Sequence, residues 1–437
     1  MKKNVLILGS GAREHALALK ILQSDLLGQL FVMPGNPGTM SVALNIPGDI
    51  MDIHAVVNTV REFDIDLVVC GPEAPLDAGI MDALSKMEGK YKPILIGPTQ
   101  AGAQLESSKA FAKTFMQKHG IPTATYKIFQ KNQLDEAMEF CSTLVPPIVL
   151  KASGLAAGKG VIICEDHMEA EREIIAMLSG KFGSASETLV IEEFMNGIEF
   201  SVFVLTNGNQ YVLLPEAKDY KRIGEGDTGL NTGGMGAISP VPFASPSLMK
   251  SICTEIIEPS IKGLQEDGIP YQGFLFFGLM VVDQQAKVIE YNCRLGDPET
   301  EAILPRIQSD LLALFLAMNA HKLDSFALEI DPRTAATVVL ASGGYPGHFP
   351  KGKTIKFPDQ MAAESYIFHA GTRTEDYILK SNGGRVLAIT SLHESPTEAL
   401  NLSLHLADQV QFEGKYFRRD IGLDVYPDKR RSDELNI

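Results

Sequence analysis

The first hundred residues alternate short apolar runs with segments of helical periodicity. The apolar runs are Val5–Leu8, Leu30–Met33, Leu67–Cys70 and Ile94–Ile96, and each ends in a turn that contains glycine or proline. This alternation is typical of a parallel sheet with helices on both faces. Ligands of such sheets bind at the carboxyl ends of the strands. The turns "GSGAR", "PGNPG", "GPEAP" and "GPT" are therefore predicted to share one ligand-binding edge.

Length, charge and cysteine content narrow the class of protein. A chain of 437 residues is too long for one ordinary core, so we expect about two to four domains. The net charge of −15 argues against nucleic-acid binding, which needs a basic surface. The cysteines have no spacing typical of a disulfide framework or a zinc site. The first apolar run ends at Gly9 and no apolar stretch reaches about 18 residues, so we expect a cytoplasmic enzyme without a membrane partner.

The stretch "KASGLAAGKGV" differs from a P-loop. Only three residues separate Gly154 from Gly158, and Gly160 follows Lys159 where a serine or threonine is expected. A strand, a glycine-rich turn and a second strand predict a hairpin lid whose backbone N–H groups contact phosphate oxygens. Lys151 at the end of the first strand could contact the same phosphates. The alternative is a tight turn with a solvated lysine.

The stretch "VIEYNCRLGDPETE" offers ligands for a metal ion. Glu290 and Asn292 are two residues apart on a predicted strand, so both side chains should point to the same face. A carboxylate and an amide oxygen suit Mg²⁺ that bridges ATP phosphates. The alternative is an edge strand with a polar outer face. That reading is disfavoured because charged residues at 294, 297, 299 and 301 follow directly.

Two further stretches could contact a nucleotide or its acceptor. Glu192 and Glu193 end an apolar strand between lid and body, where a carboxylate could accept from a purine amino group. Backbone groups near Phe194 could contribute, and Glu199 could reach ribose hydroxyls. The loop "GEGDTGLNTGGMGA" follows the basic stretch "KDYKR", which favours a loop that closes over a ligand rather than a flexible linker.

The "GSGAREH" turn begins like a dinucleotide fingerprint. Glu14 stands where the third glycine belongs, and no acidic residue ends the second strand, so nicotinamide binding is disfavoured. A helix N-terminus preceded by Gly9 and Gly11 can still bind a phosphate, and Arg13 adds a cation. The alternative is a simple βα turn. His15, beside this turn, is the histidine that deserves further examination.

The rest of the chain predicts a lid, a strand-rich body and a separate C-terminal unit. One helix is expected from Thr99 to residue 118, a compact unit over 123–190, and a long helix near 246–266. Antiparallel strands are expected after Asp331. A helix should begin after Ser395, with Pro396 at its first position.

Several of these motifs, in this order, resemble the phosphoribosylamine–glycine ligase family of the ATP-grasp superfamily. They are "GSGAREHAL", "GPEAPL", "KASGLAAGKGV", "NTGGMGAISP", "EYNCRLGDPETE" and "GGRVLAIT", and the resemblance covers about residues 1 to 425. It implies an α/β and α+β multidomain fold. A Rossmann-like parallel-sheet domain would span 1–102, and an ATP-grasp body 103–122 and 190–328. The lid would span 123–189 and a small mixed domain 329–437.

The motifs and the resemblance together predict the site. ATP is expected to contact Lys109, Lys151, Gly154, Gly158, Lys159, Gly160, Glu192, Glu193, Phe194 and Glu199, and Mg²⁺ or Mn²⁺ to bind Glu290 and Asn292. The other substrates are expected at Gly9, Gly11, Arg13, Glu14, Asp219, Arg222, Asn231, Gly233, Gly234, Arg294, Asp297 and Glu299. Arg294, Lys151 and Asp219 are the predicted catalytic residues.

The reaction that the resemblance implies joins glycine to 5-phosphoribosylamine in purine biosynthesis. ATP would phosphorylate the glycine carboxylate, and the amine would attack the resulting glycyl phosphate. Another ATP-grasp ligase with a different acceptor, a nicotinamide-dependent oxidoreductase and a non-catalytic nucleotide-binding regulator are the alternatives. The chain is expected to be a monomer or a dimer and to contact an upstream amidotransferase transiently.

The sequence departs from the usual family pattern at a few positions. Ala12 stands where the family usually has glycine, and Ser153 where it usually has aspartate. The stretch "EAKDYKR" more often reads Gln-Asp-His-Lys-Arg, so Lys218 and Tyr220 are unusual. These last changes lie in the presumed glycine pocket, whose Asp219 is retained.

Overall fold

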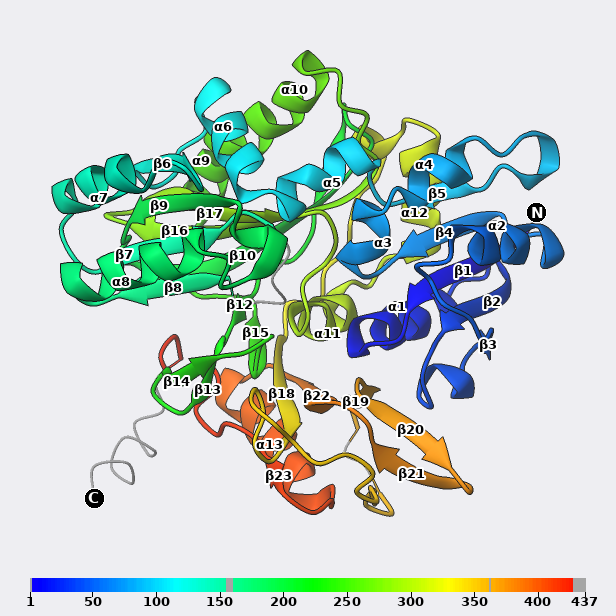
Figure 1. Ribbon diagram of the computed structural model, residues 1–437. Coiled ribbons are helices and arrows are strands. Elements are labelled where there is room, and N and C mark those ends of the chain that lie inside the picture. Colours follow the sequence, from blue (N-terminus) through cyan, green and yellow to red (C-terminus); the bar gives the residue numbers. More distant parts are fainter. Residues whose placement is uncertain (1, 155–159, 361–362, 427–437) are drawn as a thin grey trace.

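The computed structural model describes residues 2–154, 160–360 and 363–426, and its N-terminal part forms the predicted parallel sheet (Figure 1). The strand order is β3–β2–β1–β4–β5, with every neighbouring pair parallel. Its strands are β1 (Lys3–Gly9), β2 (Leu27–Pro34), β3 (Leu44–Asn45), β4 (Leu67–Cys70) and β5 (Ile94–Ile96). Its helices are α1 (Ala12–Leu22), α2 (Ile53–Glu62), α3 (Glu73–Asp77) and α4 (Ile80–Ser85).

Both faces of this sheet are buried, as the apolar runs predict. On β1, Leu6 and Leu8 belong to one hydrophobic cluster, whereas Val5 and Ile7 belong to another. Successive side chains of a strand point to opposite faces, so each cluster covers one face. Because the strands are parallel, the predicted glycine and proline turns lie at one edge.

The single helix predicted from Thr99 to residue 118 is two helices. α5 (Gln100–Ser107) and α6 (Lys109–Lys118) are separated by Ser108, whose backbone is extended. The Ser108 hydroxyl accepts from Phe111 N at 3.2 Å and so caps α6. This break places Lys109 at the start of α6, facing the lid.

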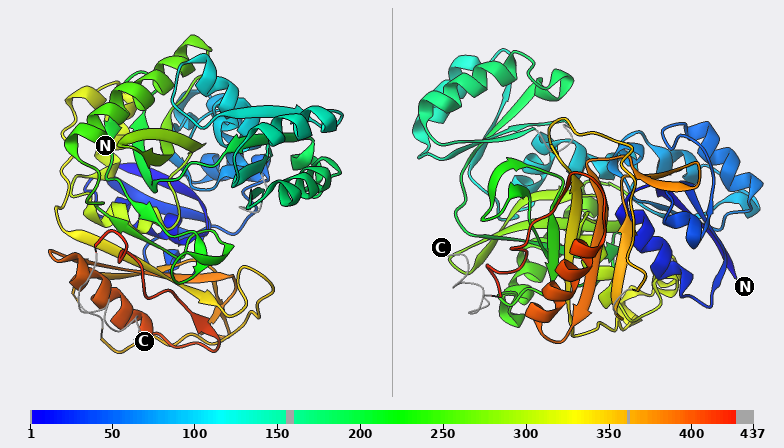
Figure 2. Two further views of the ribbon diagram at one scale, coloured as in Figure 1. Left: turned by 90° about the vertical axis from the view of Figure 1, so that its left-hand side faces the viewer. Right: turned by 90° about the horizontal axis from the view of Figure 1, so that it is seen from below.

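The lid is built on an antiparallel sheet and projects from the rest of the molecule (Figure 2). Its order is β6–β9–β7–β8, from β6 (Tyr126–Gln130), β7 (Ile148–Ala152), β8 (Val161–Cys164) and β9 (Thr188–Glu193), covered by α7 (Leu134–Thr143) and α8 (His167–Leu178). The expected boundary at 189 lies within β9. The lid residues form a hydrophobic cluster separate from those of the other domains, so the lid is joined to the body mainly at its base.

The body is built on a second antiparallel sheet. Its order is β11–β10–β16–β17, from β10 (Ile198–Thr206), β11 (Tyr211–Leu213), β16 (Gly273–Val282) and β17 (Gln285–Asn292). The predicted long helix is α9 (Pro246–Ile252) and α10 (Glu258–Glu266), joined by a π-helical turn. β17 ends at Asn292, and residues 293–298 link it to the short helix α11 (Glu299–Ile303), which lies at the centre of the molecule (Figure 1).

The C-terminal sheet takes in strands from the body. Its order is β12–β15–β18–β22–β19, with β23 on β18. The C-terminal strands are β18 (Thr334–Ser342), β19 (Ser365–His369), β22 (Arg385–His393) and β23 (Lys415–Tyr416), and the body strands are β12 (Lys218–Asp219) and β15 (Gly236–Ser239). Two hairpins lie outside it, β13 (Arg222–Gly224) with β14 (Thr228–Asn231) and β20 (Thr372–Glu375) with β21 (Ile378–Ser381).

The remaining helices follow the predicted signals. α13 (Pro396–Gln409) begins after Ser395, whose hydroxyl accepts from Glu398 N at 3.4 Å. α12 (Leu311–Asn319) is strongly apolar but short, and it is buried. Across the ranges that the structure describes, no helix has the length and apolar character needed to cross a bilayer.

Candidate active site

The predicted site residues gather where the three domains meet around α11. This helix packs against α1 of the N-terminal domain and against β15, β18 and β22 of the C-terminal sheet. The end of β17 leads into it from the body. The carboxyl edge of the parallel sheet therefore faces the end of β17 and the base of the lid.

A buried ion cluster joins the lid to the body. Glu192 on β9 places one carboxylate oxygen 2.9 Å from Lys151 Nζ and 3.0 Å from Lys113 Nζ. Lys113 lies on α6 and also donates to Thr123 Oγ1 at 2.7 Å, while Lys151 Nζ lies 3.3 Å from Ile289 O. All three charged side chains are buried. The predicted phosphate-binding Lys151 is thus held by Glu192 at the lid–body junction.

The residues predicted to contact adenine surround this cluster. The second oxygen of Glu192 is buried and has no hydrogen-bond partner within the described ranges. Glu193 accepts from Thr125 N at 2.9 Å, and Phe194 is 37% exposed. Glu192 therefore retains an unsatisfied acceptor of the kind that a purine amino group would occupy.

The glycine-rich turn is only partly within the described residues. Gly158 and Lys159 lie outside them. Gly160 O accepts from Ala152 N at 2.8 Å. A Cβ on Gly154 would lie 2.8 Å from the Cα of Ala185, so this glycine is required by close packing within the lid.

Ser153, which directly follows the lid strand β7, stabilises the start of α6. Its hydroxyl accepts from Ala110 N at 3.0 Å, and its carbonyl accepts from Lys109 N at 3.0 Å. Burial lowers the pKa of Lys109, and the Glu290 carboxylate opposes that shift. Lys109 therefore lies in the same electrostatic environment as the predicted metal ligands.

Glu290 and Asn292 share a face of β17, as their spacing predicts. They pair with Gly278 and Phe276 on β16. The Asn292 amide nitrogen is assigned to the position from which it donates to Tyr291 O and Glu106 Oε1, both at 3.1 Å, which leaves its oxygen for another ligand. Burial would raise the pKa of Glu290, but nearby lysines and an arginine lower it below its ordinary value, so Glu290 is ionised.

Lys221 is the centre of an acidic cluster. It contacts the Glu199 carboxylate and lies 3.8 Å from Glu290 Oε1. Burial would lower the pKa of Lys221, but Glu199, Asp219 and Glu290 raise it well above its ordinary value. Burial raises the pKa of Asp219, and it raises that of Glu299 to about 7 with help from the Asp219 charge. The cluster is an environment for a small cation or ammonium group.

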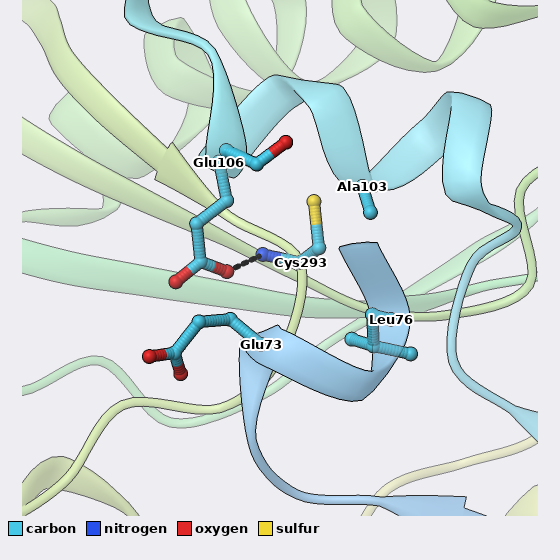
Figure 3. A pocket seen from close by; sticks show the side chains of 6 residues that line it. Glu73, Leu76, Ala103, Glu106 and Cys293 are labelled. Atoms are coloured by element: carbon cyan, nitrogen blue, oxygen red, sulfur yellow. Dashed lines mark hydrogen bonds between the residues drawn. The ribbon is translucent and has the colours of Figure 1, made fainter. Parts of the chain in front are cut away.

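Arg294 is held in a fixed orientation by two carboxylates. Its Nη2 lies 2.6 Å from Glu106 Oε1, and its Nε lies 3.5 Å from Glu73 Oε2. The other Glu106 oxygen accepts from Cys293 N at 2.7 Å (Figure 3). Figure 3 shows the Glu73 and Glu106 carboxylates pointing to the same side of a small pocket between α3 and α5. Sequence reasoning did not single out either carboxylate.

The "GSGAR" turn is filled by its own acidic residue. Glu14 Oε2 accepts from Gly11 N at 2.5 Å, and Glu14 Oε1 accepts from Arg13 Nε at 2.7 Å. Arg13 also donates to Leu295 O at 3.1 Å, which ties the turn to the segment before α11. A Cβ on Gly9 would collide with Glu14. A phosphate at the Gly11 amide would have to displace the Glu14 carboxylate.

Arg385 on β22 connects the C-terminal domain to the site. Its Nη1 donates to Gly233 O at 2.6 Å and to Asp297 O at 2.7 Å, and lies 3.1 Å from Asp297 Oδ1. A Cβ on Gly234 would lie 2.4 Å from Pro298 Cδ, so the "TGG" turn needs glycine to approach this segment. Glu299 accepts from Ser201 Oγ at 3.1 Å.

One predicted residue, Arg222, turns away from this centre. Its guanidinium donates to Gly229 O at 2.9 Å within its own hairpin, where Asn231 is its strand partner. The structure therefore brings together the predicted residues of β9, β12, β17 and α11, but not Arg222 of the β13–β14 hairpin.

Several residues of this site were not predicted from the sequence, because little in the local sequence points to them. Lys113 lies four residues after Lys109, which places both on one helix face. Lys221 lies two residues after Asp219 on an extended segment, so both point to the same side. Arg385 lies in the "GGR" motif. Glu106 could be found only through its contact with Arg294, 188 residues away.

Comparisons with known proteins match nearly the whole length of this chain. The domain models of phosphoribosylglycinamide synthetase match residues 3–106 (N domain), 107–300 (ATP-grasp A domain) and 335–424 (C domain). The phosphoribosylamine–glycine ligase of Vibrio cholerae is 46% identical over 96% of this chain and 97% of its own length. That of Chlorobaculum tepidum is 46% identical over 96% and 99%.

Solved structures support the same family and the same fold. The crystal structure of phosphoribosylamine–glycine ligase from Thermotoga maritima has a TM-score of 0.83 at 35% identity, covering 96% of this chain and all of that one (100%). The biotin carboxylase domain of Hydrogenobacter thermophilus 2-oxoglutarate carboxylase has a TM-score of 0.73 at 17% identity, over 99% of this chain and 95% of that one. The second likeness concerns the fold alone.

Proposed function

Because this chain belongs to the phosphoribosylglycinamide synthetase family and is an ATP-dependent ligase that joins glycine to phosphoribosylamine, we propose that the junction around α11 carries out the ligation through a glycyl phosphate. The observation that carries the proposal is the charge pattern of the junction. A lysine-rich side formed by Lys109, Lys113 and Lys151 adjoins an acidic side formed by Glu199, Asp219 and Glu299. The first suits the phosphates of ATP, and the second suits the ammonium group of glycine.

The first chemical step needs no nucleophile from the protein. The glycine carboxylate attacks the γ-phosphorus of ATP, the bond to the β–γ bridging oxygen breaks, and ADP leaves. The amine of phosphoribosylamine then attacks the acyl carbon and expels phosphate, giving the amide and one released proton. Catalysis therefore rests on positioning and on charge stabilisation. In this proposal Lys151 contacts the transferred phosphoryl group, and Arg294 faces the developing charge.

The residues at the end of β17 fit a divalent cation. Glu290 is ionised, and the Asn292 amide oxygen is available on the same face. Within the described ranges no group of three or more acidic, histidine or cysteine side chains could hold a metal by itself. Two protein oxygens suit Mg²⁺ or Mn²⁺ whose other ligands are phosphate oxygens and water. When bound, such an ion would neutralise charge on the phosphates.

The N-terminal edge is the proposed site of phosphoribosylamine. Glu14 and Arg13 lie there beside the segment that links β17 to α11 and contains Asp297. The carboxylates can accept from ribose hydroxyls, and Arg13 and Arg385 supply positive charge. Gly9, Gly11 and Gly234 allow the backbone to approach closely.

The test is ADP release with magnesium and ATP, in the presence and absence of glycine and of phosphoribosylamine generated in situ. Release that requires both acceptors supports the ligation and its substrates. If a different carboxylate replaces glycine, the acceptor assignment is wrong although the ATP-grasp chemistry stands. If ADP release needs neither acceptor, the glycyl phosphate step is refuted. A cytoplasmic location, a contact with an upstream amidotransferase and a monomeric or dimeric state remain predictions.

A further inference from the structure

The segment at the C-terminal end of the described chain, residues 416–426, wraps around the strand that carries Asp219. We call it the C-terminal clamp. β12 is hydrogen-bonded to β15, and β15 to β18, so the strand of Asp219 is the edge of the C-terminal sheet. The extended pairing continues past β12, because Tyr220 N donates to Gly236 O at 3.0 Å. The acidic cluster of the active site is thus built partly on the C-terminal domain.

Alternate side chains of this strand face different partners. Asp219 and Lys221 point to the acidic cluster with Glu199 and Glu290. Lys218 and Tyr220 point the opposite way, as the period of an extended strand requires. The Tyr220 hydroxyl donates to Asp424 Oδ1 at 2.5 Å.

The clamp closes around these outward-facing residues. Gly422 N donates to the Tyr220 hydroxyl at 2.8 Å, and Lys218 Nζ lies 3.2 Å from Asp424 Oδ2. Lys218 Nζ also lies 4.1 Å from the centre of the Tyr220 ring. Tyr220 is 2% exposed, although it carries a hydroxyl and lies beside two charges. Such a buried, fully bonded phenol fixes its strand in register.

The same clamp holds the glycine-rich β13–β14 hairpin. Arg418, 1% exposed, donates to Arg222 O at 3.1 Å and to Asp227 Oδ1 at 2.7 Å. Asp420 Oδ2 accepts from Gly226 N at 2.8 Å, and the Tyr416 hydroxyl donates to Ile223 O at 2.8 Å. Figure 1 shows the hairpin beside the red C-terminal segment. A loop rich in glycine is thereby held by side chains from the far end of the chain.

We propose that the C-terminal clamp sets the position of Asp219 and Lys221 in the glycine site, with Tyr220, Lys218 and Arg418 as positioning residues. This inference rests on the proposed function for the role of Asp219. Lys218 and Tyr220 both pair with Asp424, so this carboxylate joins the clamp to the strand of Asp219. The clamp acts on the acceptor side of the site and leaves the lysine cluster of the lid untouched.

The test compares Tyr220→Phe and Asp424→Asn with the control Glu375→Gln. Glu375 forms an exposed ion pair with Arg373 at 2.8 Å in the β20–β21 hairpin, outside the C-terminal clamp. We expect the glycine KM of both clamp variants to rise on the order of tenfold, as for the loss of a hydrogen bond to a charged group. The ATP KM should stay within about twofold, because the lysine cluster is separate.

Amide hydrogen exchange over residues 219–231 gives a second readout that needs no turnover. We expect faster exchange there in both clamp variants and no change in Glu375→Gln. A glycine KM equal to that of the wild type overturns the proposal, whether or not exchange changes. An equal rise in the ATP and glycine KM values overturns it as well, because that indicates general loosening.

The two hypotheses can fail separately. If the wild-type protein shows no glycine-dependent ADP release, the proposed function fails, and unchanged exchange in the clamp variants would then overturn the clamp itself. If Tyr220→Phe does not fold, Asp424→Asn decides, since the Asp424 side chain is 48% exposed and its substitution leaves the phenol in place.

Discussion

Glu192 and Lys113 form one buried ion pair, but we expect removal of the two partners to have different consequences. Two ammonium groups, those of Lys113 and Lys151, share the single carboxylate of Glu192. Lys113 is 2% exposed, Lys151 5% and Glu192 1%, so water screens none of them. The cluster therefore carries an excess positive charge before any phosphate binds.

The sizes of the two effects follow from this charge count. Glu192→Gln leaves two buried ammonium groups without a counter-charge, which should cost about 3–5 kcal/mol of unfolding free energy. Lys113→Met leaves the balanced pair of Lys151 and Glu192, so its effect should stay within about 1 kcal/mol. Thr123 keeps its own hydrogen bond to Val288 O at 2.6 Å in that variant.

The pH dependence provides an independent check. Burial lowers the pKa of Lys113 to about 8, and Glu192 only partly opposes this, whereas the ordinary value is 10.5. Between these two values the unfolded chain binds more protons than the folded protein. The unfolding free energy should therefore rise as the pH increases from 8 towards 10.5. Lys113→Met should lack this rise.

Urea unfolding followed by far-ultraviolet circular dichroism at pH 7 and pH 9 measures both effects. Limited proteolysis should find the lid more readily cleaved in Glu192→Gln, because the cluster fastens lid to body. Equal destabilisation by the two variants would refute the charge argument. A rise in stability above pH 8 that persists in Lys113→Met would show that another group causes it.

Three further predictions concern the acidic residues around β17 and α11. Glu290→Gln should abolish ADP release while the circular dichroism spectrum stays unchanged, because Glu290 is ionised and is the proposed ligand of the cation. An active variant with normal magnesium dependence would refute the assignment. The pKa of Glu299 is raised to about 7, so kcat/KM for glycine should rise as the pH increases through 7. Glu299→Gln should lack this rise. If the rise persists in the variant, another group causes it. Glu301 is buried, and within the described ranges its carboxylate oxygens have no hydrogen-bond partner. Burial raises its pKa well above the ordinary 4.5, so the folded state binds the proton more tightly and stability falls as the pH rises above that value. Glu301→Gln should remove this fall and raise the Tm at pH 7, and an unchanged Tm would contradict the reasoning.

The parts of the fold with a local cause could be predicted from the sequence. Apolar runs that end in glycine turns predicted the parallel sheet, because such strands are buried on both faces. The two-residue spacing of Glu290 and Asn292 predicted their common face, since strand side chains alternate. Ser395 and Pro396 predicted the start of α13 through capping alone.

The parts that depend on distant contacts could not be predicted. Ser108 divides the expected helix because its hydroxyl caps α6, and the Ser153 hydroxyl supports the same turn from the lid. Glu14 was expected beside a phosphate, yet its own carboxylate accepts the hydrogen bond from Gly11 N. The arrangement of the acidic cluster arises from β12 pairing with the C-terminal sheet, and no local pattern encodes that pairing.

The Asn36 side chain has a consequence for how the protein is made. Its amide nitrogen donates to Ser10 O at 2.9 Å and to His369 O at 2.7 Å, across a sequence separation of 333 residues. The His369 amide in turn donates to His15 Nδ1 at 2.9 Å, beside the same turn. Chains emerge from the ribosome N-terminus first, so the N-terminal sheet can assemble early in translation. The predicted ligand-binding edge of that sheet acquires these hydrogen-bond partners only after more than 300 further residues have been synthesised.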